Sequence, residues 1–302
     1  LIPICSSYLR AFGFSKEPLY ASIIGNVINF CLNAFFLFVL HKGVAGVATA
    51  TVVSRIINLV IVVLLGAVLV KAKQHPERES NRAVMGQIIR IGLPSACETA
   101  IYNVSMTLVI RFLNQMDAQG LNVTARSYTM QITNFSYCVG AALAQANAIM
   151  TGWHIGAKEY DACDRGTKKA AVIGVIVAVI LETVFTLCSG WIMQLFSKDP
   201  QMVSLVGKLL AIDIVLEIGR VTNLVYGQAL KTSGDAVFPV VMGACFMILC
   251  SVGGTYLFGI RLGLLAVGAY IGMTGDECVR AVGMYLRWKS GKWKEKGLVK
   301  SR

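Results

Sequence analysis

Charged residues are scarce in this 302-residue chain. They make up 15% of it, whereas hydrophobic residues make up 56% and the mean hydropathy is +0.65. Soluble domains usually contain about 25% charged residues, so the composition argues against a soluble protein. The nine cysteines show no CxxC and no histidine partners at ligand spacing. We therefore interpret them as small packing residues and expect neither a disulfide framework, nor a structural metal, nor a cofactor.

Sequence patterns typical of catalysis are missing too. The chain has no P-loop for binding nucleotide phosphates, which argues against an ATP-driven pump. Its three histidines, His41, His75 and His154, lie in loops or at the ends of apolar segments. No hydrolytic or redox set of side chains can be assembled from them. We therefore expect a protein that is not an enzyme.

Long apolar stretches, by contrast, recur throughout the chain. We count eight, each bounded by glycine, proline or charge: 19–40, 44–70, 84–113, 121–150, 167–194, 201–229, 236–258 and 262–288. Each is long enough to cross a bilayer as a helix. The sequence thus predicts an all-α polytopic membrane protein with eight transmembrane helices, whose main partner is the lipid bilayer.

The net charge of +12 comes from cations that gather in alternate loops. One set of loops holds Arg10, Lys16, the basic stretch 71–90, residues 158–169, Lys231 and a tail from Arg287. The other set holds little beyond Lys42, Arg111, Lys198 and Arg261. This asymmetry orients helices in a membrane and does not indicate nucleic-acid binding. We expect the protein to lie in the inner or plasma membrane of the cell. Both chain ends are predicted to lie in the cytoplasm.

One hinge occurs twice. The chain reads LRAFGFSKEP at 9–18 and LKTSGDAVFP at 230–239, so the two prolines are 221 residues apart (239 − 18). A span and a glycine-rich segment follow each hinge, which makes the first two spans resemble the last two. The repeat predicts two lobes of six helices, with residues 1–70 as the end of the first, 71–83 as a cytoplasmic linker, 84–290 as the second and 291–302 as a basic tail. On this plan we expect the chain to lack four earlier spans. Two such lobes are typical of transporters.

Several segments also resemble the multidrug and toxic compound extrusion (MATE) family: YLRAFGFSKEPLYASIIGNVINFCLN, GVAGVATATVVSR, IGLPSACE, AQANAIMTGWHIGAK and LKTSGDAVFP. They follow the family's order from its fifth span to its twelfth. The resemblance implies a two-lobe fold that is monomeric when complete. It also implies export of small organic, often cationic compounds in exchange for Na⁺ or H⁺, by alternating access.

In the first lobe, the resemblance singles out Asn29, Asn33 and Thr51. In relatives, the matching positions surround a cation or proton site that also includes an aspartate on an earlier helix. Asn29 and Asn33 share a helix face. Their amide oxygens could hold Na⁺ together with Thr51, or the side chains could simply join helices by hydrogen bonds. Some relatives have aspartate where Asn33 stands, so proton binding at this position is in doubt.

In the second lobe, acids and arginines lie deep in two spans, where charge is costly. They are Asp213, Glu217 and Arg220 on one helix, and Asp276, Glu277 and Arg280 on the other. Four carboxylates face two guanidiniums, so we expect pairs across the helices and two acids without a partner. The cluster is either a site that takes up coupling protons or cations, or a static lock between helices.

Glu98 is a further candidate, as a lone acid within its span. Part of the family places a carboxylate near Arg220 and another where Tyr102 stands, so that cation site cannot be transferred intact. The sequence leaves two other functions open. A lipid-linked sugar flippase would need a strongly basic cavity, whereas arginines in the interior of the spans are sparse: Arg55, Arg126, Arg220 and Arg280. A membrane enzyme or receptor finds less support.

Overall fold

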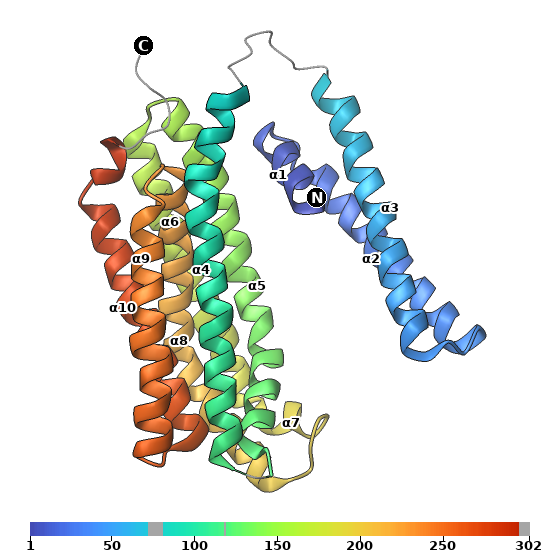
Figure 1. The fold of residues 1–302 in the computed structure, drawn as a ribbon, viewed down its shortest axis with the longest axis vertical. Helices are drawn as coiled ribbons and strands as arrows, with labels where there is room; N and C mark the ends of the chain where they lie inside the picture. The colour runs from blue at the N-terminus through green and yellow to red at the C-terminus, as the bar shows by residue number, and fades with distance from the viewer. Residues whose placement is uncertain (72–80, 118, 296–302) are drawn as a thin grey trace. The chain divides into compact units, whose positions relative to one another are not determined.

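The computed structural model describes residues 1–71, 81–117 and 119–295, and every element in that part of the chain is helical. The chain forms two compact units, Leu1–Glu79 and Ser80–Arg302 (Figure 1), which are considered separately below. Most of the predicted linker (72–80) and most of the predicted tail (296–302) lie outside the described residues.

The first unit contains one short and two long helical segments. They are α1 (Ile2–Ala11), α2 (Lys16–Ala34) continued by the π-helix η1 (Phe35–Val39), and α3 (Gly43–Lys71). Both α1 and α2 pack on α3. The buried core is small, consisting of Leu9, Ala21, Val62 and Val70, and many other large apolar side chains are exposed. Such exposure suits helices whose surroundings are as apolar as their side chains.

The second unit is a bundle of long helices (Figure 1). Its elements are α4 (Asn81–Met116), α5 (Leu121–Gly156), α6 (Tyr160–Leu187), α7 (Ser189–Met193), α8 (Pro200–Thr232), α9 (Val237–Phe246), η2 (Met247–Val252), η3 (Thr255–Arg261), α10 (Leu265–Lys289) and η4 (Lys292–Glu295). Helix α8 packs against α5, α6 and α10. It therefore touches three of the unit's other long helices, and its side chains form much of the interior.

Four helical segments are long and apolar enough to cross a membrane by length and composition. They are Lys16–Val39, Gly43–Val70, Tyr160–Leu187 and Val237–Arg261. Long helices also occupy the other four predicted spans, as α4, α5, α8 and α10. Polar residues within them, such as Asp213 and Asp276, lower their hydropathy. Eight transmembrane helices thus remain a prediction, whereas eight long helical segments are observed in the described residues.

The two hinge segments share the same backbone geometry, down to single hydrogen bonds. Gly13 has φ of 88° and Gly234 has φ of 92°, the left-handed region that suits glycine. At the first hinge the amide of Phe14 donates to the carbonyl of Leu9 (3.0 Å), and at the second Asp235 donates to Leu230 (2.9 Å). These positions are 221 residues apart (235 − 14).

The offset grows by one residue further along each span. At the next turn Lys42 donates to the carbonyl of Phe36, and Leu264 donates to that of Phe258, with an offset of 222 (264 − 42). The second copy therefore contains one extra residue between hinge and turn. It also contains an additional π-helical stretch, η2. A π-helical hydrogen bond joins residues five apart, whereas an α-helical one joins residues four apart. The π-helix η2 can therefore accommodate one inserted residue within a continuous helix.

Glycines let α10 approach its neighbours at backbone distance. A Cβ added to Gly272 would lie 2.9 Å from the carbonyl oxygen of Cys250 and 3.0 Å from the Cα of Gly254. One added to Gly219 on α8 would lie 2.9 Å from the backbone of Cys278. Small residues at helix contacts allow such close packing in membranes. They bring the charged part of α10 close to α8 and η2.

This contact predicts opposite effects for two glycines on one helix. Gly272→Ala should destabilise the unit by at least about 1–3 kcal/mol, as overpacking against backbone does. Gly275→Ala is the control, because no atom lies within 4 Å of its added Cβ, and it should stabilise α10 by roughly 0.5–1 kcal/mol. Unfolding in detergent micelles would measure both. Equal effects would contradict the close contact.

Candidate functional site

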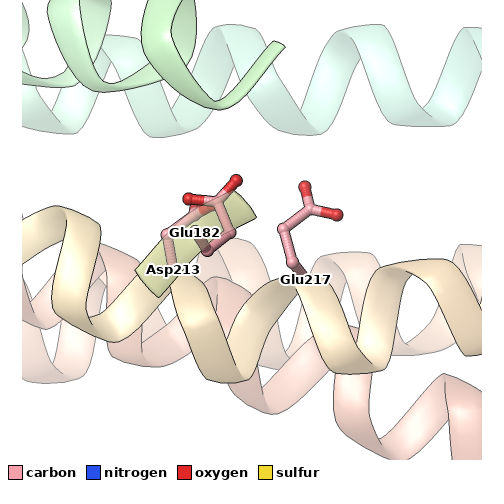
Figure 2. Close-up of side chains that lie close together, drawn as sticks. All are labelled: Glu182, Asp213 and Glu217. Atoms are coloured by element: carbon pink, nitrogen blue, oxygen red, sulfur yellow. The ribbon is translucent and has the colours of Figure 1, made fainter. Parts of the chain in front are cut away.

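Three carboxylates meet inside the second unit. One carboxylate oxygen each from Glu182 on α6 and from Asp213 and Glu217 on α8 all lie within 4.8 Å of one another. Figure 2 shows Asp213 and Glu217 on the same side of α8, with Glu182 beside Asp213. Glu182 and Glu217 are fully buried and Asp213 is 2% exposed. We call these three residues the acid cluster.

The helix periodicities explain why these side chains meet. Asp213 and Glu217 are four residues apart on α8, which places them on one face. Helix α6 buries one stripe, made of Cys163, Thr167, Ala171, Gly174, Ala178 and Glu182. Its other side carries exposed Ile176 and Ile180. The side chains of this stripe are small up to Glu182, so α6 can lie close to its neighbours. Glu182, at the end of the stripe, is therefore buried inside the bundle.

Most oxygens of the acid cluster have no hydrogen-bond partner among the described residues. This holds for both oxygens of Glu182, for Oδ2 of Asp213 and for Oε2 of Glu217. The hydroxyl of Ser136 on α5 is buried beside Glu182 and is a nearby donor that could reach its carboxylate, although not at ordinary hydrogen-bond geometry. Buried polar atoms usually are satisfied, so this group of acceptors indicates that a proton or a cation belongs among them.

A second group of charges adjoins the acid cluster and is well paired. Arg280 of α10 contacts Asp276 through Nε and Oδ1 (2.8 Å) and Glu277 through Nη2 and Oε1 (2.8 Å). Arg220 of α8 pairs with Glu217 and lies 3.9 Å from Glu277. Ser251 donates to Asp276 (3.0 Å) and Asn223 to Glu277 (3.0 Å). We call Arg220, Asp276, Glu277 and Arg280 the arginine network; Glu217 joins it to the acid cluster.

Two cavities border these charges. The first, of about 220 Å³, is lined by Arg126, Asp213, Arg220, Tyr270, Asp276 and Glu277, among others. The second, of about 390 Å³, is lined by Glu98, Asn223, Arg220, Lys231, Glu277 and Arg280, among others. Arg220 and Glu277 belong to the walls of both. A movement of the Arg220 side chain would therefore change both spaces at once.

In the first unit, the predicted polar residues form a chain of hydrogen bonds. Asn33 donates to Asn29 (3.1 Å), Asn29 donates to Ser54 (3.1 Å), and Ser54 donates to the backbone carbonyl of Thr51 (3.0 Å). The Thr51 hydroxyl is exposed and donates to Val47 of its own helix. The structure thus brings Asn29 and Asn33 together, with Thr51 joined to them through its backbone. A Na⁺ site at these three residues stays a prediction.

Comparison with known proteins places this geometry in a family. The MatE family profile matches residues 94–257, more than half of the chain. Over 305 residues the chain is 33% identical to the transporter YisQ of Bacillus subtilis, covering 99% of this chain and 67% of YisQ. The chain belongs to the MATE family. It therefore belongs among membrane transporters rather than enzymes.

More distant MATE proteins match along the same length. A probable multidrug resistance protein NorM of Thermotoga maritima is 21% identical over 310 residues, covering 99% of this chain and 65% of NorM. A crystal structure of a MATE protein in its straight conformation superposes with a TM-score of 0.86 at 19% identity, covering 97% of this chain and 67% of the other. The chain thus spans about two thirds of the length of these relatives, and the predicted all-α multi-pass membrane fold is confirmed.

One expectation about the acids of this MATE chain was wrong, and another acid has a partner that was not predicted. Glu98, the one acid of its predicted span, lies 2.6 Å from Lys231, near the end of α8. Of the four acids on α8 and α10, only Asp213 lacks an ion pair among the described residues, since Arg280 serves two carboxylates. Among the described residues, the one ion pair that joins α8 to α10 is the long contact between Arg220 and Glu277; the other ion pairs of these four acids lie within one helix.

Glu182 was missed, although the sequence carries a signal for it. It is an acid within an apolar segment, the criterion that singled out Glu98. It also continues the four-residue spacing of small residues through Gly174 and Ala178. The partner of Glu98 could not be found in this way, because the sequence places Lys231 in a loop and the tertiary fold brings its side chain to Glu98 of α4.

The arginine network predicts a large loss of stability when one cation is removed. Arg280→Met should cost about 3–5 kcal/mol, because it leaves buried Asp276 without its cation. Lys168→Met is the control: it breaks an exposed, solvent-screened pair with Asp164 and should leave the free energy of unfolding nearly unchanged. Denaturant unfolding in micelles measures both. Similar small losses would show that the network is well hydrated.

Proposed function

We propose that this chain works in the efflux of small organic compounds across the cell membrane, coupled to entry of Na⁺ or H⁺ by antiport. Support comes from its membership in the MATE family and from relatives named as probable multidrug resistance proteins. Cytoplasmic chain ends and a monomeric transporter remain predictions. The coupling ion is proposed to bind at the acid cluster.

The single observation that carries this assignment is the unbalanced charge of Glu182, Asp213 and Glu217. Three ionised carboxylates this close repel one another strongly in a medium of low dielectric constant. One guanidinium, that of Arg220, offsets only one of them. Isolated buried charge costs far more than folding can tolerate, so further positive charge must enter as protons or as a metal cation. Oxygen donors of this kind suit both.

Binding at the acid cluster can be passed to the cavities through Glu217. When the cluster is empty, Arg220 is held by Glu217 and lies within reach of Glu277. A cation or proton on Glu217 weakens that hold, because it competes for the same carboxylate. Arg220 is then free to shift toward Glu277, which is shared with Arg280. Since Arg220 lines both cavities, ion binding would reshape the space that a transported compound uses.

The competing hypotheses make different demands on the same residues. A static lock requires opposite charges in balance, and Glu182 has no cation partner among the described residues. A lipid-linked sugar flippase requires strongly basic walls, whereas the first cavity carries Asp213, Asp276 and Glu277 beside its arginines. An ion-coupled exporter is the function that this arrangement supports best.

The coupling role predicts that Glu182→Gln abolishes ion-driven transport without weakening the fold. Ethidium uptake into everted vesicles, driven by a proton or a Na⁺ gradient, should fall at least about tenfold, which corresponds to about 1.4 kcal/mol in the transition state. Thermal stability should stay equal or rise, because the substitution removes one of three repelling charges. Glu159→Gln is the control, since Glu159 is exposed and pairs with His154.

Ion binding can be measured without transport. Adding Na⁺ to weakly buffered protein should release protons from the wild type and fewer from Glu182→Gln, if the two ions compete for the acid cluster. A proton-only site would release none but would show proton uptake on acidification that the variant lacks. If Glu182→Gln transports and binds ions as the wild type does, the acid cluster has only a structural role and the proposed coupling is wrong.

A further inference from the structure

One buried arginine takes no part in either group of charges. Arg126 on α5 is 6% exposed, and its Nε has no hydrogen-bond partner among the described residues. Its Nη2 lies 3.6 Å from the sulfur of Met106, which is a weak acceptor. No carboxylate of the described residues lies within 4.0 Å of its guanidinium, the distance used for ion pairs. A guanidinium stays charged in proteins, so it cannot relieve the cost of burial by losing a proton.

A buried charge is almost always paired, and leaving one unpaired is strongly destabilising. An arginine in this position therefore indicates an anionic group that the chain itself does not provide. Because the guanidinium presents a planar fork of donors, it matches the two oxygens of a carboxylate. Arg126 lines the cavity of about 220 Å³, so a small ligand in that cavity could bring such a group to it.

The same cavity contains an unpaired charge of the opposite sign. Asp213 also lines it, is 2% exposed, and has an oxygen, Oδ2, without a partner among the described residues. Tyr270 lies near both charges and is buried. The remaining charges in the wall, Arg220, Asp276 and Glu277, are already paired within the arginine network or with Glu217.

We infer that the first cavity binds a zwitterionic organic compound, whose carboxylate pairs with Arg126 and whose ammonium group pairs with Asp213. An anion alone would meet a wall that holds more acids than free cations, and a cation alone would leave Arg126 unpaired. A zwitterion satisfies both. Tyr102, Tyr137, Met106 and Met130 supply the apolar and aromatic surface for the body of such a compound.

This inference rests on the proposed function in one respect. Asp213 belongs both to the acid cluster and to the cavity, so the coupling ion and the ammonium group of the ligand would compete for it. Because only one of them can occupy Asp213 at a time, binding of the ion would favour release of the ligand, as antiport requires. The carboxylate contact with Arg126 lies outside the acid cluster and can be tested by itself, by equilibrium binding without any gradient.

The test uses three matched probes on the full chain in lipid nanodiscs, measured by isothermal titration. The zwitterion is para-(aminomethyl)benzoate. The anion para-methylbenzoate carries only the negative charge, and the amine para-methylbenzylamine carries only the positive charge. The zwitterion should bind at least about tenfold more tightly than either analogue, as expected for an added charge-assisted hydrogen bond. In Arg126→Gln its affinity should fall about tenfold to hundredfold, to that of the amine, whose own affinity should not change.

Two further variants complete the design. Arg261→Gln is the matched control, because Arg261 is exposed and contacts Tyr256 outside the cavity, and it should bind all three probes as the wild type does. Arg126→Lys keeps the charge without the fork and should bind the zwitterion with intermediate affinity; this variant decides the matter if Arg126→Gln does not fold.

Three results would overturn the inference. The first is unchanged zwitterion binding in a folded Arg126→Gln protein, or in Arg126→Lys if only the lysine variant folds. The second is a wild-type protein that binds the amine more tightly than the zwitterion. The third is no measurable binding of the zwitterion at millimolar concentration. None of these outcomes touches the proposed ion coupling, because Glu182 and transport are absent from the measurement. Conversely, normal transport by Glu182→Gln would leave a selective Arg126 contact standing.

Discussion

The second unit is organised by the cost of placing charge in an apolar interior. Helix α8 carries Asp213, Glu217 and Arg220 through the middle of a helical bundle, where each isolated charge would be prohibitive. The neighbouring helices respond in two ways. Helix α10 supplies Asp276, Glu277 and Arg280, which pair with one another and reach Arg220. Helix α6 supplies Glu182, which increases the imbalance. Glu182 adds a repelling charge and so does not stabilise the fold. A functional role explains the charge imbalance better than a structural one.

Charge imbalance and connectivity together explain why one site can respond to another. Glu217 belongs to the acid cluster and also holds Arg220; Arg220 reaches Glu277, which holds Arg280. A change in the charge of one carboxylate therefore alters the best position of a guanidinium that lines two cavities. The proposed coupling requires no long conformational pathway, because the acid cluster and the first cavity share Asp213, and Arg220, which pairs with Glu217, lines both cavities. Arg126 stands apart from this chain of contacts, which is why its unpaired charge points to a ligand rather than to the network.

The sequence allowed the long helical segments and the charges within them to be predicted, but not all of the partners of these charges. Apolar length and breaks at glycine and proline located the long helical segments, since these depend on local physics. Spacing on α8 correctly placed Asp213 with Glu217, whereas Asp276 pairs with Arg280 of its own helix and not across the helices as expected. The pairing of Glu98 with Lys231 depends on where the tertiary fold places α4 relative to the end of α8, which has no local pattern in the sequence. Glu182 lay within reach of sequence reasoning, whereas its closeness to Asp213 also required the packing of α6 on α8.

The repeat offers an internal comparison that bears on why the charges exist. Asn29 donates to Ser54 in the first unit, and Ser251 donates to Asp276 in the second; Ser54 and Asp276 are 222 residues apart (276 − 54). Asn58 occupies the position that corresponds to Arg280 at the same offset. The two units thus join equivalent helices by a hydrogen bond at equivalent points, one between neutral side chains and the other to a carboxylate that also pairs with Arg280 of its own helix. Since a neutral hydrogen bond is sufficient to join these helices in the first unit, adhesion alone does not require Asp276 and Arg280 to be charged. A charged pair costs more to bury than a neutral one, and its retention beside Glu277 and Arg220 is best explained by the response of these charges to an ion or a ligand.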